Sequence, residues 1–291
     1  MKLLVIDGNS IVNRAFFGMH PLNNREGFPT HAIFGFLNIL RRMEEEVDPD
    51  GVCVTFDRKE PTFRHLAYAD YKAQRKGMPE ELASQMPILK DVLSAMNIPC
   101  YELAGWEADD LIGTISRRCE AAGWDCRVAT GDKDSLQLVT DHTYVELVTT
   151  RMGKTTTQEM DPGAFRAAYG FAPAQMVDLK ALMGDSSDNI PGVPSIGEKT
   201  ATSLITAYGS IENIKAHLDE VKPPSAKKAL EEHYDMAVMS KELALICLDC
   251  PIDFSWDEAR LTNLYTPEAY QYMKRLEFKS ILTRFDVQSM G

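Results

Sequence analysis

The 291-residue sequence lacks any apolar run near the ~20 residues that a helix needs to span a bilayer. Its N-terminus, MKLLVIDGNS, has an apolar stretch that is too short for a signal peptide, and Asp7 interrupts it. With 44% hydrophobic and 25% charged residues, the composition is that of an ordinary soluble globular protein. We therefore expect a cytoplasmic, monomeric chain with no membrane partner, long enough for one large domain or two modest ones.

Cysteine and histidine are also scarce and show no metal-binding spacing. Four of the six cysteines fall within or beside apolar patterns and are predicted to be buried thiols: Cys53, Cys100, Cys119 and Cys126. Cys247 and Cys250 form a single CxxC with no second pair and no suitably spaced histidine, which favours a structural role. None of the six histidines forms an HExxH motif. A zinc finger and a zinc peptidase are therefore excluded.

The net charge of −12 argues against nucleic-acid binding by bulk positive charge. A local basic stripe is what such binding requires, and one follows the second predicted strand: Arg58, Lys59, Arg64, His65, Lys72, Arg75 and Lys76. Tyr68 and Tyr71 interleave with it, so bases could stack where phosphates are neutralised. The alternative is a solvated loop face.

Acidic residues are concentrated in five short clusters, four of which follow an apolar run that is typical of a strand. The nine residues are Asp7; Asp57; Glu107, Asp109 and Asp110; Asp132 and Asp134; and Asp185 and Asp188. The carboxyl ends of parallel strands meet at one edge of a sheet, where ligands bind. Four of the five clusters should therefore converge on one place.

Each cluster taken singly has a simpler explanation, as a helix N-cap, a helix start or a turn. None of these explanations accounts for the shared position of the clusters at strand ends. Two unit charges ~4 Å apart repel by roughly 4 kcal/mol at an effective dielectric near 20. Oxygen ligands favour Mg²⁺ or Mn²⁺, and phosphodiester cleavage is the chemistry that most needs two such ions.

Strand and helix patterns alternate through the first half of the chain. The predicted strands are KLLVID, GVCVTFD, IPCYEL, DCRVATG and TYVELV, with helical patterns near 31–46, 79–96 and 106–122. This alternation predicts an α/β fold with a mostly parallel sheet and helices on both faces. The basic segment should overhang the acidic residues as an arch, which we place within 58–96 of a core spanning 1–160.

After about residue 161 the strand patterns stop and only helices are predicted, with Gly or Pro at their ends. Residues 161–291 are therefore expected to form a helical region that packs on the sheet. It contains a Gly-rich turn, Gly192-Val-Pro-Ser-Ile-Gly197-Glu-Lys-Thr-Ala201, whose helix start suits a phosphate. It is similar to a helix-hairpin-helix, near 185–208, which grips a DNA backbone without reading sequence. A nucleotide-binding P-loop is excluded because Glu198 separates Gly197 from Lys199 and no strand precedes the glycines.

These motifs together resemble the 5′ nuclease, or flap endonuclease, family, and most closely the 5′–3′ exonuclease domain of bacterial DNA polymerase I. The resemblance runs from Leu3 to about Phe285. It is carried by VIDGNS, TFDRKEPTFRH, YKAQR, EADDLIGT, TGDKD, GDSSDNIPGVPSIGEKTA and LEFKS, in the family's order. It implies a PIN-like sheet with a helical arch over the site, and structure-specific cutting of DNA in replication and repair.

The resemblance also implies residue roles. The nine carboxylates named above would hold two Mg²⁺ or Mn²⁺ ions, directly or through water. Lys72 and Arg75 of the YKAQR motif would clamp the scissile phosphate and stabilise transition-state charge, and Tyr71 would stack on a terminal base. Arg64 is a further candidate contact with DNA. Gly192, Ser195, Gly197 and Lys199 would hold duplex DNA, with K⁺ as a candidate ion at the hairpin.

One position departs from the family pattern, because Ser195 stands where glycine is usual, and its Cβ restricts the backbone. The expected partner is DNA with a 5′ flap, a nick or a free 5′ end, and a DNA polymerase is a candidate protein partner. Two other functions remain open at this stage. One is a DNA-binding scaffold without turnover, and the other is an RNA-directed ribonuclease with a similar acidic site.

Overall fold

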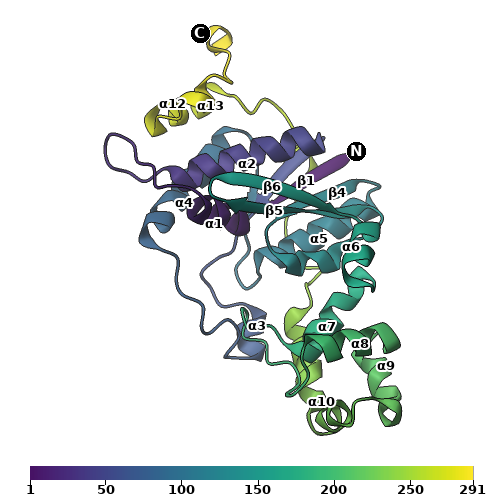
Figure 1. The fold of residues 1–291 in the computed structure, drawn as a ribbon. Helices are drawn as coiled ribbons and strands as arrows, with labels where there is room; N and C mark the ends of the chain where they lie inside the picture. Colours follow the sequence, from purple (N-terminus) through teal and green to yellow (C-terminus); the bar gives the residue numbers. More distant parts are fainter. Residues whose placement is uncertain (291) are drawn as a thin grey trace.

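The fold is organised around one six-stranded sheet, as seen in a computed structural model that describes residues 1–290 (Figure 1). The strand order is β3-β2-β1-β4-β5-β6. The strands are β1 (Lys2–Asp7), β2 (Gly51–Thr55), β3 (Cys100–Tyr101), β4 (Asp125–Thr130), β5 (Thr143–Arg151) and β6 (Lys154–Met160). All neighbours pair in parallel except β5 and β6, which form an antiparallel hairpin. The predicted mostly parallel α/β sheet is confirmed, and the edge strand β6 was not anticipated.

The strands are buried on both faces, which is why they read as continuous apolar runs. In β1, Leu3 and Val5 point to one core and Leu4 and Ile6 to the other, following the two-residue period of a strand. The sequence of β6, KTTTQEM, is polar because most of its residues are exposed at the sheet edge. Its turn at Gly153, with φ of +76°, lets it pair back on β5.

Helices cover both faces of the sheet. α1 (Gly8–Gly18), α2 (His31–Val47) and α4 (Glu80–Ala95) share a core with the Leu4 face, and α5 (Ala108–Ala121) packs on the Leu3 face. α5 begins directly after Glu107, where the Asp110 side chain accepts the Glu107 backbone N–H at 3.1 Å. The sheet and its helices thus bring the ends of β1, β2 and β4 and the start of α5 to one edge.

The segment between β2 and α4 carries the basic stripe and lies over that edge. It holds one short helix, α3 (Phe63–Ala67), followed by turns and an exposed link to α4. Its turns are anchored below, because Lys72 donates its backbone N–H to the Asp188 carbonyl at 2.8 Å and Asn189 donates its side-chain N–H to the Asp70 carbonyl at 2.7 Å. The arch therefore rests on the turn at 185–190.

The second half is helical and extends away from the sheet (Figure 1). Its helices are α6 (Pro162–Tyr169), α7 (Met176–Met183), α8 (Glu198–Tyr208), α9 (Ile211–Ala216) and α10 (Pro224–Ala244), with 3₁₀ turns η2 (Pro173–Gln175) and η3 (Leu218–Glu220). α7, the Gly-rich turn and α8 follow one another in the region predicted for the helix-hairpin-helix. The helices predicted after residue 161 are thus present here as α6 to α10.

The described part of the predicted helical region, residues 161–290, does not stay together in space, unlike the single region that we expected for 161–291. α12 (Pro267–Leu276) and α13 (Lys279–Leu282) lie at the opposite end of the molecule from α7–α10 (Figure 1). Met273 and Phe278 are buried in the core shared with α2 and α4. α11 (Trp256–Ala259) sits beside the sheet, since Gly51 bridges to Arg260. The apolar face of α12 accounts for this return, because the core of the α/β half is the apolar surface within its reach.

Among residues 1–290, no helix is both long enough and apolar enough to cross a bilayer. All six cysteines are free thiols. Cys53, Cys119 and Cys126 are buried as predicted, whereas Cys100 is only partly buried. The CxxC pair is structural in its contacts, because the Cys250 backbone N–H donates to the Thr114 hydroxyl at 3.0 Å and the Cys247 backbone N–H donates to Asp110 at 2.9 Å.

Candidate active site

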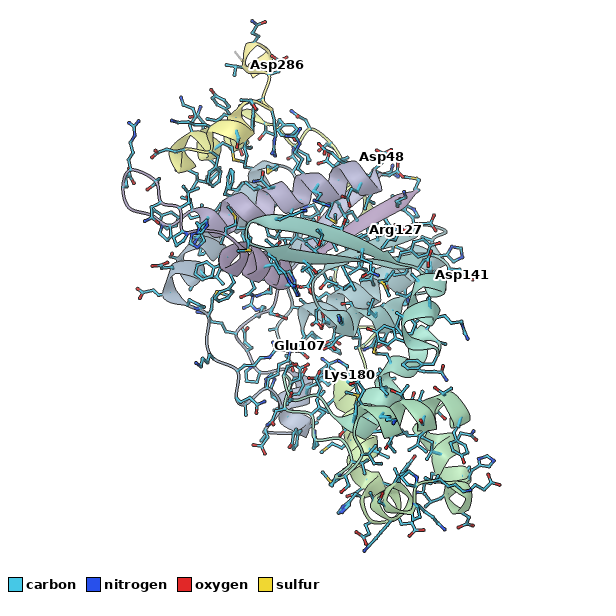
Figure 2. The ribbon with its side chains drawn as sticks, in the orientation of Figure 1. Asp48, Glu107, Arg127, Asp141, Lys180 and Asp286 are labelled. Atoms are coloured by element: carbon cyan, nitrogen blue, oxygen red, sulfur yellow. The ribbon has the colours of Figure 1, made fainter. Side chains whose placement is uncertain are left out.

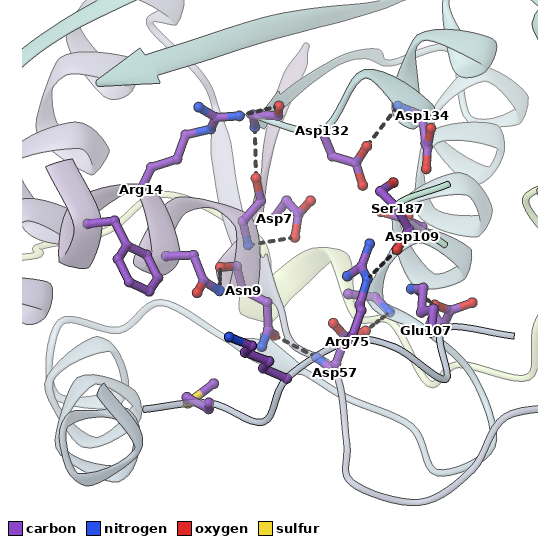
Figure 3. A pocket seen from close by; sticks show the side chains of 18 of the residues that line it. Asp7, Asn9, Arg14, Asp57, Arg75, Glu107, Asp109, Asp132, Asp134 and Ser187 are labelled. Atoms are coloured by element: carbon purple, nitrogen blue, oxygen red, sulfur yellow. Dashed lines mark hydrogen bonds and ion pairs between the residues drawn. The ribbon is translucent and has the colours of Figure 1, made fainter. Parts of the chain in front are cut away.

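A cavity of about 760 Å³ lies at the carboxyl edge of the sheet, between α1 and the arch (Figure 3). Six carboxylates line it: Asp7, Asp57, Glu107, Asp109, Asp132 and Asp134. The arch contributes Lys72, Arg75, Lys76 and Met78, and α1 contributes Asn13, Arg14 and Phe17. The structure therefore brings the four strand-end clusters together, as the parallel topology predicted.

Asp7 forms the floor of the cavity at the end of β1. It is 4% exposed and accepts hydrogen bonds from the Thr130 hydroxyl at 2.7 Å and the Ser10 backbone N–H at 3.3 Å. Burial raises the pKa of Asp7 to about 7, helped by the charges of Asp57 and Asp132 and opposed by the Thr130 hydrogen bond. The Asp7 carboxylate is thus costly to ionise without a cation beside it.

Asp57 and Asp132 are aimed into the cavity by short polar contacts at the ends of β2 and β4. Asn9 accepts the Asp57 backbone N–H at 2.8 Å, and Asp57 accepts the Ala108 backbone N–H at 2.7 Å. Asp132 caps the 3₁₀ helix η1 (Lys133–Leu138), accepting the Asp134 backbone N–H at 2.9 Å. Asp132, for which a turn was the simpler explanation, is thus a helix cap, and Asp7 is the N-cap of α1 as its own simpler explanation held. A cap oxygen still leaves one carboxylate oxygen for a ligand.

The pKa values of Asp109 and Glu107, at the start of α5, are shifted in opposite directions. Loss of hydration raises the pKa of Asp109 well above its usual value, and the charges of Asp132 and Asp7 add to the shift. Burial acts in the same direction on Glu107, but Lys72 and Arg64 outweigh it and the pKa of Glu107 lies below its usual value. Glu107 is therefore an anion already paired with protein cations.

The fifth acidic cluster, which follows a helix rather than a strand, joins the site as well. One carboxylate oxygen from each of Asp134, Asp185 and Asp188 lies within 4.8 Å of the others. Asp185 is oriented by the Ser187 hydroxyl at 2.7 Å and the Ser187 backbone N–H at 3.0 Å. We call these three residues the Asp134 triad. It forms a second acidic group beside the Asp7 floor.

Asp110 is not in the cavity, contrary to the expectation that it holds a metal. It is fully buried and forms a two-pronged ion pair with Arg64, each N–O distance being 2.8 Å. Arg64 also donates to Glu107 at 2.5 Å and to the carbonyls of Leu243 and Leu245 at 3.0 and 2.7 Å. Arg64 is 3% exposed, so its predicted contact with DNA is not available in this conformation.

Tyr71 differs from its expected role in the same way. It is 4% exposed and its hydroxyl donates to Glu107 at 3.0 Å, so its ring does not face a terminal base. Lys72 forms an ion pair with Glu107, and Arg75 forms one with Asp188. Lys72 holds a φ of +55°, an uncommon conformation that often accompanies functional sites. Lys72 and Arg75 thus contact carboxylates of the acidic site directly, and their role as a clamp on the scissile phosphate stays a prediction.

The Gly-rich turn lies beyond the triad and leads into α8. Gly192 has a φ of +64°, and a Cβ there would lie 2.3 Å from the Gly184 backbone nitrogen, so only glycine fits. Ser195 is exposed with a φ of +72°, a conformation that favours glycine. Gly197 precedes α8 without a side-chain cap, and Lys199 is exposed in the first turn. The start of α8 therefore has backbone donors open to solvent.

Sequence reasoning missed several residues that shape the site. Thr130 donates to the Asp7 carboxylate, and Asn9 accepts the Asp57 backbone N–H. Arg14 donates to the Gly131 carbonyl at 2.6 Å at the cavity wall. Lys180 of α7 forms ion pairs with Asp134 and Asp185. Asn9 belonged to the quoted VIDGNS motif, whereas Lys180 carried no signal beyond being one basic residue in an apolar helix.

The residues present fit divalent ions. The donors are carboxylate oxygens, with neither cysteine nor histidine among the residues lining the cavity, which suits hard cations such as Mg²⁺ or Mn²⁺. Two groups of carboxylates lie next to each other: Asp7 with Asp109 and Asp132, and the Asp134 triad. Burial raises the pKa values of Asp7, Asp109 and Asp132, and a bound cation would favour their ionised forms.

Comparison with known proteins agrees with this geometry. The sequence matches the 5′-3′ exonuclease N-terminal resolvase-like domain over residues 2–170 and the 5′-3′ exonuclease C-terminal SAM fold over residues 171–266. DNA polymerase I of Bacillus caldotenax is 42% identical over 99% of this chain, which spans 33% of that protein. The chain thus spans about a third of the length of the curated relatives it matches.

Two solved structures show the same fold. Bacteriophage T5 5′-exonuclease with bound zinc has a TM-score of 0.70 and 21% identity, covering 96% of this chain and 99% of that one. The T5 D15 flap endonuclease in complex with DNA and metal ions has a TM-score of 0.65 and 22% identity, covering 98% of this chain and 96% of that one. With both family domains matched in order and the acidic site assembled, the chain belongs to the 5′-3′ exonuclease family, the structure-specific 5′ nucleases.

Proposed function

We propose that the chain hydrolyses DNA phosphodiester bonds at 5′ ends and at single-to-double-strand junctions, as a 5′–3′ exonuclease and flap endonuclease that uses two divalent ions. The observation that carries this proposal is the cavity itself, lined by six carboxylates and faced by Lys72 and Arg75. Carboxylates alone would repel a phosphate group, whereas carboxylates that face cations on the opposite wall of the cavity can hold a phosphate group. The solved T5 relatives contain zinc in one case and DNA with metal ions in the other, which supports the assignment.

The protein's own groups have distinct tasks in this proposal. Asp7 with Asp109 and Asp132 would hold one ion, and the Asp134 triad would hold the other. Glu107 would connect this acidic site to Lys72, with which it is paired. Bound ions would lower the pKa of an attacking water and stabilise the leaving oxygen. Lys72 and Arg75 would exchange their present partners, Glu107 and Asp188, for the scissile phosphate, adding positive charge where it develops.

Duplex binding is assigned to the Gly-rich turn and the start of α8. Its open backbone donors and the exposed Lys199 suit the backbone phosphates of a duplex. The cavity lies between α1 and the arch and is lined by Ser187 of the turn that precedes the Gly-rich turn, so a duplex held at the start of α8 would bring its single-stranded end to the acidic site. K⁺ at the turn and a DNA polymerase as functional partner are further parts of the proposal, the latter supported by the polymerase relatives.

One gel assay tests this function. A 5′-labelled flap, a nicked duplex, a single strand and an RNA flap are each incubated with Mg²⁺ or with EDTA. We expect Mg²⁺-dependent cutting near the junction of the DNA flap, and none by Asp134→Asn, which keeps the side-chain shape. Lys133→Gln, at an exposed neighbouring position, is the matched control. Flap binding without cutting by the wild type would favour a scaffold, and preference for the RNA flap would favour a ribonuclease.

A further inference from the structure

Lys180 enters the acidic site from the helical half of the molecule. Glu107 and Lys180 lie in the same region between the sheet and α7–α10 (Figure 2), and both line one small cavity. The Lys180 ammonium contacts Asp134 and lies 3.2 Å from an Asp185 carboxylate oxygen. Its side chain is only 15% exposed. The lysine is therefore a nearly buried cation held by two carboxylates.

Those two carboxylates belong to the Asp134 triad, whose oxygens lie within 4.8 Å of one another. A cation coordinated by the triad would have to occupy the space between them. The Lys180 ammonium already contacts two of these three carboxylates. A lysine ammonium has three donors and no acceptor, so it satisfies these oxygens much as a metal ion would.

The third member of the triad is neutralised differently. Asp188 pairs with Arg75, whose side chain is 52% exposed and lies on the arch. Arg75 can turn toward solvent or substrate because half of its side chain is exposed, and Asp188, whose side chain is 7% exposed, would then need another cation. Lys180 instead projects from α7, where Val177, Ala181 and Leu182 are buried in the core. Because its backbone is fixed, the ammonium stays near the triad unless a stronger cation displaces it.

We propose that Lys180 is a resident counter-ion of the Asp134 triad, which competes with a divalent ion for this position and so lowers the affinity of the second ion. The inference rests on the proposed two-ion function. Among residues 1–290, no ion pair within 4 Å joins Asp7, Asp109 or Asp132 to a protein cation. The two ion positions are therefore unequal: the Asp7 floor binds first and tightly, and the triad fills only when Lys180 moves aside.

This arrangement has a use in a nuclease. A lysine on the triad keeps the site charge-balanced while no second ion is bound, which spares the fold the repulsion of three adjacent carboxylates. The displaced ammonium remains tethered beside the triad, where the substrate phosphate arrives. Binding of the second ion would therefore release the Lys180 ammonium toward the phosphate in the same step.

The test measures ion binding without DNA. Calorimetric titration of the whole chain with Mn²⁺ is compared for the wild type, Lys180→Met, which keeps length without charge, and Lys180→Arg, which keeps the charge. Lys241→Met is the matched control, because Lys241 also bridges two carboxylates, Asp178 at 2.8 Å and Glu212 at 3.1 Å, outside the triad. Thermal unfolding is recorded for each variant in EDTA and in Mn²⁺.

We expect Lys180→Met to tighten the weaker Mn²⁺ site about tenfold, which corresponds to about 1.4 kcal/mol. Lys180→Arg and Lys241→Met should leave both sites within about a factor of three of the wild type. The melting temperature of Lys180→Met should fall in EDTA and recover with Mn²⁺, because bound ligand stabilises the folded state. If Lys180→Met does not fold, Lys180→Gln takes its place.

The failures are distinguishable. A wild type that binds no Mn²⁺ would remove the two-ion function on which the inference stands. A wild type that binds two ions, with Lys180→Met binding the weaker one equally well or less well, would overturn the counter-ion role alone. That result would place Lys180 among the groups that support the bound ion.

Discussion

The burial of Arg64 leads to a sharp prediction about stability. From its place in the basic stripe, Arg64 was expected to contact DNA, and in that case its removal would weaken DNA binding and leave the fold intact. In the structure, its guanidinium is 3% exposed and donates to Asp110, Glu107 and the carbonyls of Leu243 and Leu245. Arg64→Ala would therefore leave the buried Asp110 carboxylate without a counter-charge.

Removing one partner of a buried ion pair costs about 3–5 kcal/mol, because the remaining charge stays desolvated. We expect Arg64→Ala to lose about that much unfolding free energy. Arg64→Lys should lose less, because it keeps the charge but not the two-pronged geometry. Arg58→Ala is the matched control: Arg58 is exposed and pairs with Glu60 and Glu102, so its loss should cost no more than about 1 kcal/mol.

Urea denaturation followed by tryptophan fluorescence gives the unfolding free energies, and fluorescence anisotropy with a labelled flap gives the DNA affinity. The double variant Arg64→Ala with Asp110→Asn should recover part of the loss, since the buried charge is gone. If Arg64→Ala unfolds within about 1 kcal/mol of the wild type while its flap affinity drops strongly, Arg64 is a DNA contact and the buried arrangement is not the one that matters.

Four further changes test other parts of the structure. Lys72→Ala should lower the single-turnover rate on the order of 10²-fold or more with little change in flap affinity; a change in affinity alone would assign Lys72 to general electrostatic binding. Lys199→Ala should reduce the salt dependence of duplex binding by about one unit of slope, equally for all sequences; loss of cleavage at saturating substrate would contradict the anchoring role. Ser195→Gly should raise the unfolding free energy by about 0.5–1 kcal/mol by relieving the φ of +72°, and a destabilised variant would show that the serine hydroxyl compensates. Glu146 lies opposite Glu159 in the β5–β6 hairpin, and burial together with Glu159 raises the pKa of Glu146 to about 8. The folded state then holds more protons than the unfolded one, so stability from this group is full below about pH 4.5 and is lost as the pH rises to about 8. Glu146→Gln should accordingly gain about 3–4 kcal/mol over the wild type at pH 8 relative to pH 5 in urea denaturation, since each unit of pKa shift is worth about 1.4 kcal/mol, and an equal gain at both values would refute the shift.

Local pattern was sufficient for much of the fold. Continuous apolar runs predicted β1, β2 and β4 because strands covered on both faces need apolar residues at every position. The residue that follows such a strand must lie at the carboxyl edge, so Asp7, Asp57 and Asp132 could be assigned to one site without coordinates. The glycine at 192 was similarly informative, since its turn admits no side chain.

Contacts between distant segments could not be predicted in this way. Arg64 and Tyr71 lie in a polar, basic stretch, and only the packing of α3 against 243–245 and the start of α5 buries them. α12 returns to the core of α2 and α4 because its apolar face finds a complementary surface there, a match that depends on shape rather than on sequence period.

The site shows the same division most clearly. The order of residues shows where the acidic charge is carried, and the strand pattern predicts that a parallel sheet gathers it. How that charge is neutralised emerges only in the folded chain: Asp110 by Arg64, Glu107 by Lys72, and the Asp134 triad by Lys180 and Arg75. Electrostatic pairing acts over a few ångströms. Apart from Lys180 and Asp185, which are 5 positions apart, these partners are 35 to 113 positions apart and reach that distance only after the chain has folded.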